Sequence, residues 1–534
     1  MATVTSTRGL SKSKYTSFSQ CPKALWLKTY KPEEEIVDES TMARFEQGNE
    51  VGDLAMGLFG PYVEVTTTKE DGSLDLKAMI AKTQEEMAKG TAVICEASFT
   101  YDGNYCAVDI LRKTEEGWVI YEVKSSSFPE SKVEKAKLDK YVPDIAYQKW
   151  VLTQCGVNVT GTYLVCLNKG YVRQGELDIN RLFVITDMKE MIANEYDLVP
   201  TKVKLAKEII NSDVEPNVDL SESCQKKHYA CGFWEYCKRA HGVPSPSVFN
   251  VYGGKTCGGF TIKRKLECYR KGCLTYEDLW KMNETPTGED WQKGITKIQL
   301  MQLQGGLTGA EFIDHAGIKE FLDTLSYPLY FLDFETMQDA VPQYDGAKVY
   351  GQITFQYSLH ILESPSTPIN KATVTHKEFL APSDGSDPRR ALAEQLCRDI
   401  PMNACTLAYN KSFECSRIKE LAELYPDLAG HLTNIEEHIL DLLDPFQKGM
   451  YYVPAMGGSF SIKSVLPALY PSEPELDYHN LDSRVQHGGN AMTIFPKIKD
   501  MDPTEAAASR EALLRYCELD TWAMVKVWEK LMKA

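Results

Sequence analysis

The stretch "NYCAVDILRKTEEGWVIYEVKSSS", residues 104–127, decides the fold of the N-terminal part of the chain. It holds two β-rich runs, 104–113 and 118–127, joined by the turn signal TEEG. A third run of this kind, "TAVICEASFTY" (91–101), comes just before an Asp-Gly turn signal. Together the three runs predict an antiparallel meander.

Three charged side chains of this stretch are predicted to meet. Because side chains alternate along a strand, Glu122 and Lys124 share one face, and the turn brings Asp109 beside Glu122. Two carboxylates can hold a hard divalent cation such as Mg²⁺ or Mn²⁺. The lysine can orient a water or stabilise charge that develops on a phosphoryl group. The alternative is an exposed strand that carries a weak Glu–Lys pair.

Helical and strand patterns around the meander extend it into a mixed α/β domain. Residues 1–90 have a mainly helical pattern. A helix over 142–156 and a strand over 159–172 follow the meander. Proline, serine and glycine gather at 242–256, as they do at domain boundaries, so we predict a first domain over 1–240.

This arrangement resembles the RecB-like PD-(D/E)XK nucleases, in the branch that includes the CRISPR-associated RecB-type exonucleases. The resemblance implies that Asp109 and Glu122 bind the metal and that Lys124 is catalytic. It also implies that Gln148, on the helix after the meander, contacts the substrate. Glu96 stands where members of the family often have a polar residue on the preceding strand.

One feature departs from that family. Many members carry a metal-binding histidine on an N-terminal helix, and the matching stretch here, "FEQGNEVGDLA" (45–55), has none. Glu46, Glu50 and Asp53 are the candidates to replace it.

The C-terminal part contains a second set of acidic residues. In the strand-like run "PLYFLDFETM" (328–337), Asp333 and Glu335 share a face and would repel each other without a cation between them. Tyr516 and Asp520 lie four apart on a helix, and so on one face. Between these elements, Glu414 stands at the start of a helix. The alternatives are a solvent-facing acid pair and an ordinary surface Tyr–Asp pair.

Strand patterns at 352–362 and 374–381 and an amphipathic helix at 508–533 complete this part of the chain. We therefore predict a second α/β domain over 326–534. Residues 241–325 are then a linker and a helical connector.

The second set resembles the DEDD, or DnaQ-like, exonucleases of the ribonuclease H-like fold. The D-x-E motif is matched by Asp333 and Glu335, and the Y-x-x-x-D motif by Tyr516 and Asp520. Glu414 replaces the usual middle aspartate. The resemblance implies that the four carboxylates bind two Mg²⁺ or Mn²⁺ ions and that Tyr516 positions the attacking water. Asp441 is a further candidate acid of this region.

Three cysteines, Cys224, Cys231 and Cys237, follow the first domain's core with the spacing C-x6-C-x5-C. The spacing leaves His228, His241 and Cys21 as candidates for a fourth ligand, and plain burial of the thiols is the alternative. In the iron–sulfur branch of the RecB-like nucleases, one cysteine precedes the core and three follow it. The resemblance therefore implies a [4Fe–4S] cluster on Cys21 and these three cysteines.

Composition limits the class of protein. The net charge is −16, so an evenly basic nucleic-acid coat is excluded, although a local phosphate-binding cleft is not. No apolar run approaches 18 residues, and the polar N-terminus has no signal-peptide pattern, so we expect a cytoplasmic protein without membrane contact. Fifteen cysteines in such a chain favour reduced thiols or metal ligation.

These features predict a metal-dependent nuclease of two α/β nuclease domains. By family resemblance we expect its substrate to be DNA, single-stranded or with a free end, and RNA stays open for the second domain. Two alternatives remain. In one, only the C-terminal site is active and the N-terminal domain is a DNA-binding clamp. In the other, the protein is a non-catalytic nucleic-acid-binding scaffold.

Overall fold

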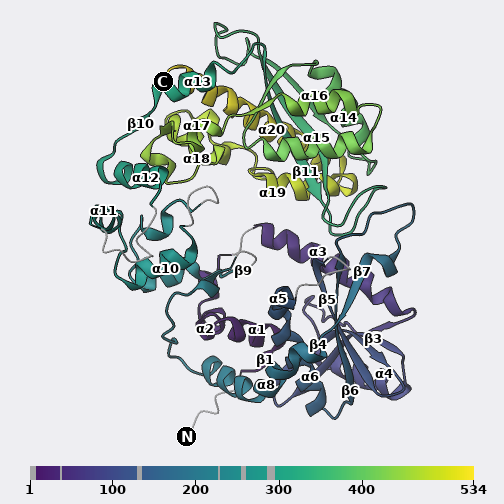
Figure 1. Ribbon diagram of the computed structural model, residues 1–534. Coiled ribbons are helices and arrows are strands. Elements are labelled where there is room, and N and C mark those ends of the chain that lie inside the picture. The colour runs from purple at the N-terminus through teal and green to yellow at the C-terminus, as the bar shows by residue number, and fades with distance from the viewer. Residues whose placement is uncertain (1–7, 37–38, 129–134, 227–228, 254–259, 286–294) are drawn as a thin grey trace. The chain divides into compact units, whose positions relative to one another are not determined.

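The computed structural model describes residues 8–36, 39–128, 135–226, 229–253, 260–285 and 295–534 (Figure 1). Its internal contacts divide the chain into two compact units. Unit 1 consists of Met1–His241 and Asp339–Gly351, and unit 2 of Gly242–Gln338 and Gln352–Ala534. Both are mixed α/β structures. None of the helices in these described ranges is long and apolar enough to span a bilayer.

In the described part of unit 1, seven strands form one sheet, in the order β2–β3–β4–β5–β6–β7 with β1 also paired to β4. Their bounds are β1 (Leu10–Ser11), β2 (Val63–Glu64), β3 (Val93–Tyr101), β4 (Asn104–Lys113), β5 (Trp118–Phe128), β6 (Val159–Asn168) and β7 (Phe183–Asp187). The predicted meander is confirmed, because β3, β4 and β5 pair antiparallel in sequence order. The predicted strand β6 then lies parallel to β5.

Helices cover both faces of this sheet. One apolar core packs residues of α1, α6 and α8 against one face, and the other packs α3 and residues of 339–351 against the opposite face. The helices of unit 1 are α1 (Lys12–Gln20), α2 (Pro22–Tyr30), α3 (Glu39–Met56), α4 (Leu76–Lys89), α5 (Lys135–Leu138), α6 (Val142–Gln154), α7 (Ile179–Leu182), α8 (Lys189–Ile210) and α9 (Trp234–Ala240). The short strands β8 (Gln225–Lys226) and β9 (Tyr229–Ala230) form a hairpin before α9.

Unit 2 is built on a sheet whose described strands number five, in the order β13–β12–β11–β14–β15. The predicted strands β11 (Leu329–Gln338), β12 (Gln352–Leu362) and β13 (Thr375–Leu380) are antiparallel neighbours. β14 (Cys405–Ala408) and β15 (Ile439–Asp441) run parallel to β11. The central strand β11 is therefore flanked on both sides, and its side chains are largely buried.

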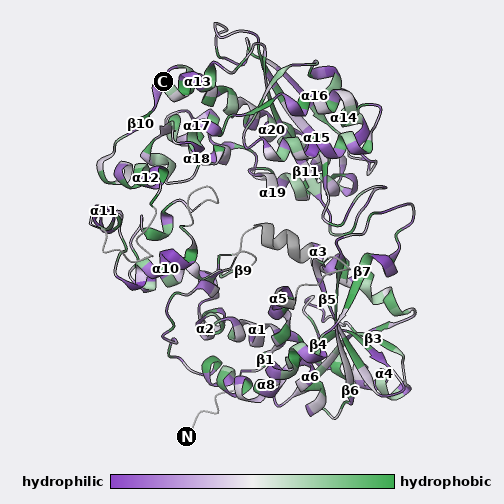
Figure 2. Ribbon diagram, viewed as in Figure 1, coloured by the Kyte–Doolittle hydropathy of each residue, from purple (hydrophilic) through white to green (hydrophobic). Residues whose placement is uncertain are grey.

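Helices α14 (Arg389–Asp399), α15 (Ser412–Leu424) and α16 (Ala429–Glu437) contribute to the main core of unit 2 with β11 and β12. The long α20 (Pro503–Met532) contacts β11, β12 and β13. Figure 2 shows hydrophobic and hydrophilic residues side by side along helices such as α8 and α16, as amphipathic helices require. The other elements are α10 (Ile262–Arg270), α11 (Tyr276–Glu284), α12 (Lys297–Thr308), β10 (Phe312–Ile313), α13 (His315–Leu322), α17 (Asp444–Gln447), β16 (Tyr451–Tyr452), α18 (Ile462–Leu469) and α19 (Gly488–Ile494).

The units do not follow the chain as simply as the predicted domains. The segment 241–325, predicted as a connector, belongs almost entirely to unit 2. The segment 339–351 lies between β11 and β12 in sequence but belongs to unit 1. There the Tyr350 hydroxyl donates to the Ser125 carbonyl (2.6 Å), and Ala340, Val341 and Val349 enter the core.

Candidate functional site

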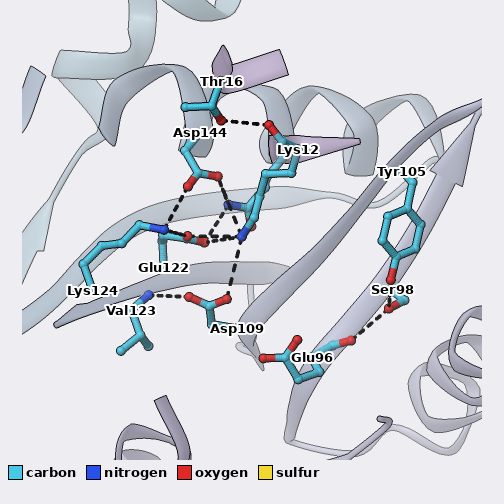
Figure 3. A network of polar contacts seen from close by, with 11 residues as sticks. Lys12, Thr16, Glu96, Ser98, Tyr105, Asp109, Glu122, Val123, Lys124 and Asp144 are labelled. Carbon is cyan, nitrogen blue, oxygen red and sulfur yellow. Dashed lines mark hydrogen bonds and ion pairs between the residues drawn. The ribbon is translucent and has the colours of Figure 1, made fainter. Parts of the chain in front are cut away.

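The first cluster of acidic residues lies where the sheet of unit 1 forks. β4 pairs with β5 only from Ile110 to Lys113, so Asp109 is the first residue of β4 beyond that pairing. Its Oδ2 accepts a hydrogen bond from the Val123 backbone N–H, at 2.6 Å. The meander therefore brings Asp109 to the end of β5 that carries Glu122 and Lys124, as the sequence predicted (Figure 3).

Lys12 enters the same cluster from the N-terminus. β1 pairs with β4 at Asn104 and Tyr105, and Ser11 caps the helix that begins at Lys12. The Lys12 Nζ lies 3.1 Å from Glu122 Oε1 and 3.7 Å from one oxygen each of Asp109 and Asp144. Figure 3 shows this ammonium group among the three carboxylates.

Helix α6 supplies the remaining members, Asp144 and Gln148. Lys124 pairs with Glu122 and, at 2.9 Å, with Asp144. The Gln148 amide donates to both carboxylates, at 2.6 Å to Glu122 and 2.9 Å to Asp144. The structure thus brings together Asp109, Glu122, Lys124 and Gln148, the predicted residues. Sequence reasoning missed Lys12 and Asp144, although Asp144 lies four residues before Gln148 and so on one helix face.

Burial and charge set the protonation of this cluster. Glu122 is fully buried, and burial together with the Asp109 and Asp144 charges raises its pKa to about 7. Burial opposes ionisation of Asp144, but Lys12 and Lys124 outweigh it and hold the pKa of Asp144 below its usual value. Conversely, the carboxylates overcome burial and raise the pKa of both lysines. The lysines are therefore charged at neutral pH.

Glu96 faces the cluster from β3 in a strained conformation. Its neighbours Cys95 and Ala97 pair with Ile110 and Val108, which puts Glu96 opposite Asp109. Its φ of 56° is in the left-handed region, which is uncommon outside glycine and recurs at functional sites. Burial and the Asp109 charge raise its pKa to about 7.

The donor set fits a hard divalent cation. Oxygens of Asp109, Glu122 and Asp144 converge on one ammonium group, and carboxylate oxygens are the ligands that Mg²⁺ and Mn²⁺ prefer. Of the candidates on α3, Asp53 adds negative charge near Glu96, whereas Glu50 is hydrogen-bonded to Gln343. The side chain of Glu46 lies outside the described residues.

We predict that Lys12→Met destabilises the metal-free protein by about 3 kcal/mol, because it leaves the three carboxylates with only one of the two lysines that neutralise them. Thermal unfolding in EDTA measures this change. Mg²⁺ should restore part of the loss. Lys14→Met, on the same helix, is the control. Equal stability of the two variants in EDTA would contradict the prediction.

The second cluster gathers acids from three elements of unit 2. β11 carries Asp333 and Glu335, α15 carries Glu414 in its first turn, and α20 carries Asp520. All but the partly buried Asp333 are 7% exposed or less. One carboxylate oxygen of Asp333, one of Glu335 and the sulfur of Cys517 lie within 4.8 Å of one another.

Burial, together with repulsion between the acids, dominates the electrostatics of this cluster. Burial and the Asp520 charge raise the pKa of Asp333 and Glu335 well above their usual values. Burial raises the pKa of Glu414 to about 8 and that of Asp520 to about 6. Glu414 Oε2 is buried without a hydrogen-bond partner among the described atoms. Such a set fits a divalent cation, which would supply the missing partner.

Two aromatic hydroxyls and a lysine surround these acids. Tyr516 is buried against Asp520, and Tyr478 donates to Asp520 at 2.6 Å. The Lys463 Nζ lies 4.8 Å from the ring centroid of Tyr478 and 5.0 Å from that of Tyr516. Tyr516 is therefore where the sequence predicted it. Sequence reasoning did not single out Tyr478 or Lys463 as site residues.

Asp441 has a different environment from the clustered acids. Its carboxylate accepts backbone hydrogen bonds from Asn410 (2.9 Å), Lys411 (3.1 Å) and Leu443 (3.0 Å). These bonds hold the chain just before α15, where Asn410 has a φ of 68°. Asp441 thus fixes the turn that presents Glu414.

These raised pKa values predict a pH dependence for the metal-free protein. A carboxyl whose folded pKa exceeds its unfolded pKa binds more protons when folded, so stability falls as pH rises between the two values. We expect the thermal midpoint in EDTA to fall between about pH 4.5 and pH 8. Glu414→Gln should flatten this profile, and Mg²⁺ should raise the midpoint most at pH 8. The exposed Glu423→Gln is the control, and a profile equally steep in both variants would contradict the prediction.

The predicted cysteines also come together. Cys21, at the junction of α1 and α2, lines one small pocket of unit 1 with Cys224, Cys231 and Cys237. Ala24, Trp26, Leu27 and Phe233 form the apolar surroundings. Burial raises the pKa of Cys21 and Cys231, and that of Cys237 to about 12. Four thiols around one pocket fit the ligand set of a [4Fe–4S] cluster. His241 instead contacts the Val218 carbonyl, and His228 lies outside the described residues.

Comparison with known proteins gives two matches. Residues 330–461 match a family model described as Domain of unknown function (DUF2779), and this range includes Asp333, Glu335 and Glu414. A curated relative, Uncharacterized protein UU173 of Ureaplasma parvum serovar 3, is 27% identical over 232 residues. The match covers 40% of this chain and 32% of the relative, so the chain spans about a third of that protein's length. Neither description names an activity.

Proposed function

We propose that this protein is a metal-dependent nuclease that hydrolyses phosphodiester bonds of DNA. The observation that carries the proposal is the second cluster. Asp333, Glu335, Glu414 and Asp520 come from three segments up to 187 residues apart in sequence and converge in a buried site beside Tyr516. Bound cations would stabilise four buried, mutually repelling carboxylates, and two-metal phosphodiester hydrolysis uses such a set.

The architecture of each unit supports this function. In unit 2, the first strand of the sheet is central and carries Asp333 and Glu335, which supports a ribonuclease H-like, DnaQ-type domain. In unit 1, a meander is followed by a helix that carries Gln148 and by a parallel strand, which supports a PD-(D/E)XK domain. Both assignments rest on the motifs together with these topologies.

The side chains have distinct chemical tasks in the proposed reaction. Bound Mg²⁺ or Mn²⁺ would activate a water and stabilise negative charge on the phosphoryl oxygens. Asp333, Glu335, Glu414 and Asp520 would hold these ions in unit 2, and the Tyr516 hydroxyl would orient the water. In unit 1, Asp109 and Glu122 would hold the metal, and the Lys124 ammonium group would stabilise the developing charge.

Two observations favour a narrower alternative, in which only unit 2 cleaves. In unit 1 the Lys12 ammonium lies among the oxygens that would hold a metal, and α3 carries no histidine in "FEQGNEVGDLA". Unit 1 would then serve as a DNA-binding clamp. Both this alternative and the main proposal assign cleavage to the acidic site of unit 2. Variants that change one site at a time therefore distinguish them.

The test uses single-stranded and duplex DNA, labelled at either end, with Mg²⁺ or Mn²⁺. We expect Asp333→Asn and Lys124→Ala each to abolish one cleavage activity, with a loss of about 100-fold or more in rate. The exposed Asp323→Asn and Lys169→Ala are the matched controls. If Lys124→Ala changes no cleavage while Asp333→Asn removes all of it, the clamp alternative holds. Binding without any cleavage of DNA or RNA by the unaltered protein would favour a scaffold.

We also propose that Cys21, Cys224, Cys231 and Cys237 bind a [4Fe–4S] cluster that ties the N-terminal helices to the end of unit 1. Metal ligation and folding are coupled in such sites. Anaerobically purified Cys21→Ser should therefore lose iron, labile sulfide and visible absorbance, and unit 1 should unfold at a lower temperature. The exposed Cys155→Ser is the control. A colourless or zinc-loaded unaltered protein would refute the cluster.

A further inference from the structure

Beside the second cluster, unit 2 has a groove that the proposed reaction does not use. Its volume is about 750 Å³, within the range of about 300–1,000 Å³ that is usual for ligand sites. The walls come from three segments, 249–253, 409–410 and 457–462, together with Lys265 of α10, Leu443 and Gln447. All of these residues belong to unit 2.

A buried glutamine joins two of these walls. The Gln302 side chain is 1% exposed. Its Nε2 donates to the carbonyls of Asn250 (2.9 Å) and Gly457 (3.3 Å), and its Oε1 accepts from the Tyr252 N–H (2.8 Å). These bonds fix the spacing of the walls, so the groove is a built feature of the fold.

The 457–462 wall depends on glycine for its close approach. Gly458 has a φ of 81°, and a Cβ added to it would lie 2.1 Å from the Gln302 Nε2. Any other residue would push the wall away from Gln302. The glycine at position 458 therefore permits the close approach that gives the groove its shape.

Lys265 places a cation in the wall. Its Nζ donates to the carbonyls of Phe249 (2.9 Å) and Val251 (2.6 Å), which use two of its three N–H groups. Among the described residues no carboxylate forms an ion pair with it. Burial lowers its pKa to about 8, so most molecules carry the charge at neutral pH. An anion in the groove would complete its hydrogen bonding and stabilise the buried charge.

Aromatic rings line the groove near this cation. Tyr252 and Phe460 are in edge-to-face contact, with centroids 4.9 Å apart. Tyr409 lines the groove as well, and its hydroxyl donates to the Phe460 carbonyl at 2.7 Å. Rings of this kind stack on bases of any sequence, and a nearby cation binds the backbone phosphate.

Two walls lead directly into the acidic site. Tyr409 and Asn410 come just before the helix that begins with Ser412 and carries Glu414. Ile462 comes just before Lys463, whose Nζ lies over the Tyr516 ring. A single strand of nucleic acid whose end is bound at the four carboxylates can therefore run along the protein segments that form the groove.

We propose that this groove binds the single-stranded nucleic acid next to the bond that is cleaved, with one phosphate on Lys265 and a base stacked on Tyr252, whose ring is supported by the buried Phe460. The inference rests on the proposed function, and it names a substrate subsite formed partly by residues 249–253 and Lys265. It accounts for three features together: the unpaired cation, the ring-lined walls and the glutamine that joins the walls.

The test measures binding in EDTA with the Asp333→Asn protein and fluorescent oligothymidylate of eight nucleotides. We expect Lys265→Met to weaken binding about tenfold. It should also reduce the slope of log affinity against log salt by about 0.7, the value for one phosphate contact on a single strand. Lys263→Met, with the same charge change two residues away, is the matched control.

A second variant separates recognition from support of the fold. Tyr252→Leu keeps the backbone bonds to Gln302 and removes the ring, so binding should weaken several-fold without a change in salt slope. Tyr252→Phe should retain binding. Thermal unfolding of each variant checks that the groove is still formed.

The outcomes distinguish this inference from the proposed function. If Lys265→Met and Tyr252→Leu both bind like Lys263→Met, the groove is not a subsite, even if the unaltered protein cleaves DNA. If binding depends on Lys265 and Tyr252 but the unaltered protein cleaves nothing, the proposed function fails and the groove stands as a nucleic-acid site. If neither the DNA oligomer nor its RNA counterpart binds, the inference is overturned.

Discussion

Repulsion between buried carboxylates is the constraint on which both candidate sites depend. In unit 1 the chain relieves it with its own cations, because Lys12 and Lys124 form ion pairs with Glu122 and Asp144. In unit 2 no such ion pair forms among the described residues, and burial raises the pKa of Asp520 to about 6. The two sites therefore differ, because the acids of unit 1 are paired with two lysines, whereas those of unit 2 have the Lys463 charge nearby without an ion pair among the described residues.

Much of each site was visible in the sequence because it depends on short-range periodicity. Glu122 and Lys124 share a face because a strand alternates, and Tyr516 and Asp520 do so because a helix turns. The strands β3–β6 and β11–β13 followed from alternating apolar residues and turn signals. Motif resemblance then linked segments far apart in sequence, such as Cys21 and the three later cysteines.

The missed residues depend on tertiary register, which no local pattern encodes. Lys12 reaches Glu122 only because the two-residue strand β1 pairs with β4 where β5 has diverged. Tyr478 reaches Asp520 from a 3₁₀ turn 42 residues away in sequence. The helices α10–α12 of the predicted connector belong to unit 2, which also holds the acidic site, and Lys265 of α10 lines the groove.

The segment 339–351 makes unit 1 depend on residues that lie within the sequence of unit 2. The chain leaves unit 2 three residues after Glu335, contributes Ala340 and Val349 to the core of unit 1, and returns to unit 2 at Gln352. A gene cut at residue 241 would thus yield an N-terminal piece that lacks part of its own interior. A recombination event that joined only residues 1–241 to another gene would therefore transfer an incomplete unit 1.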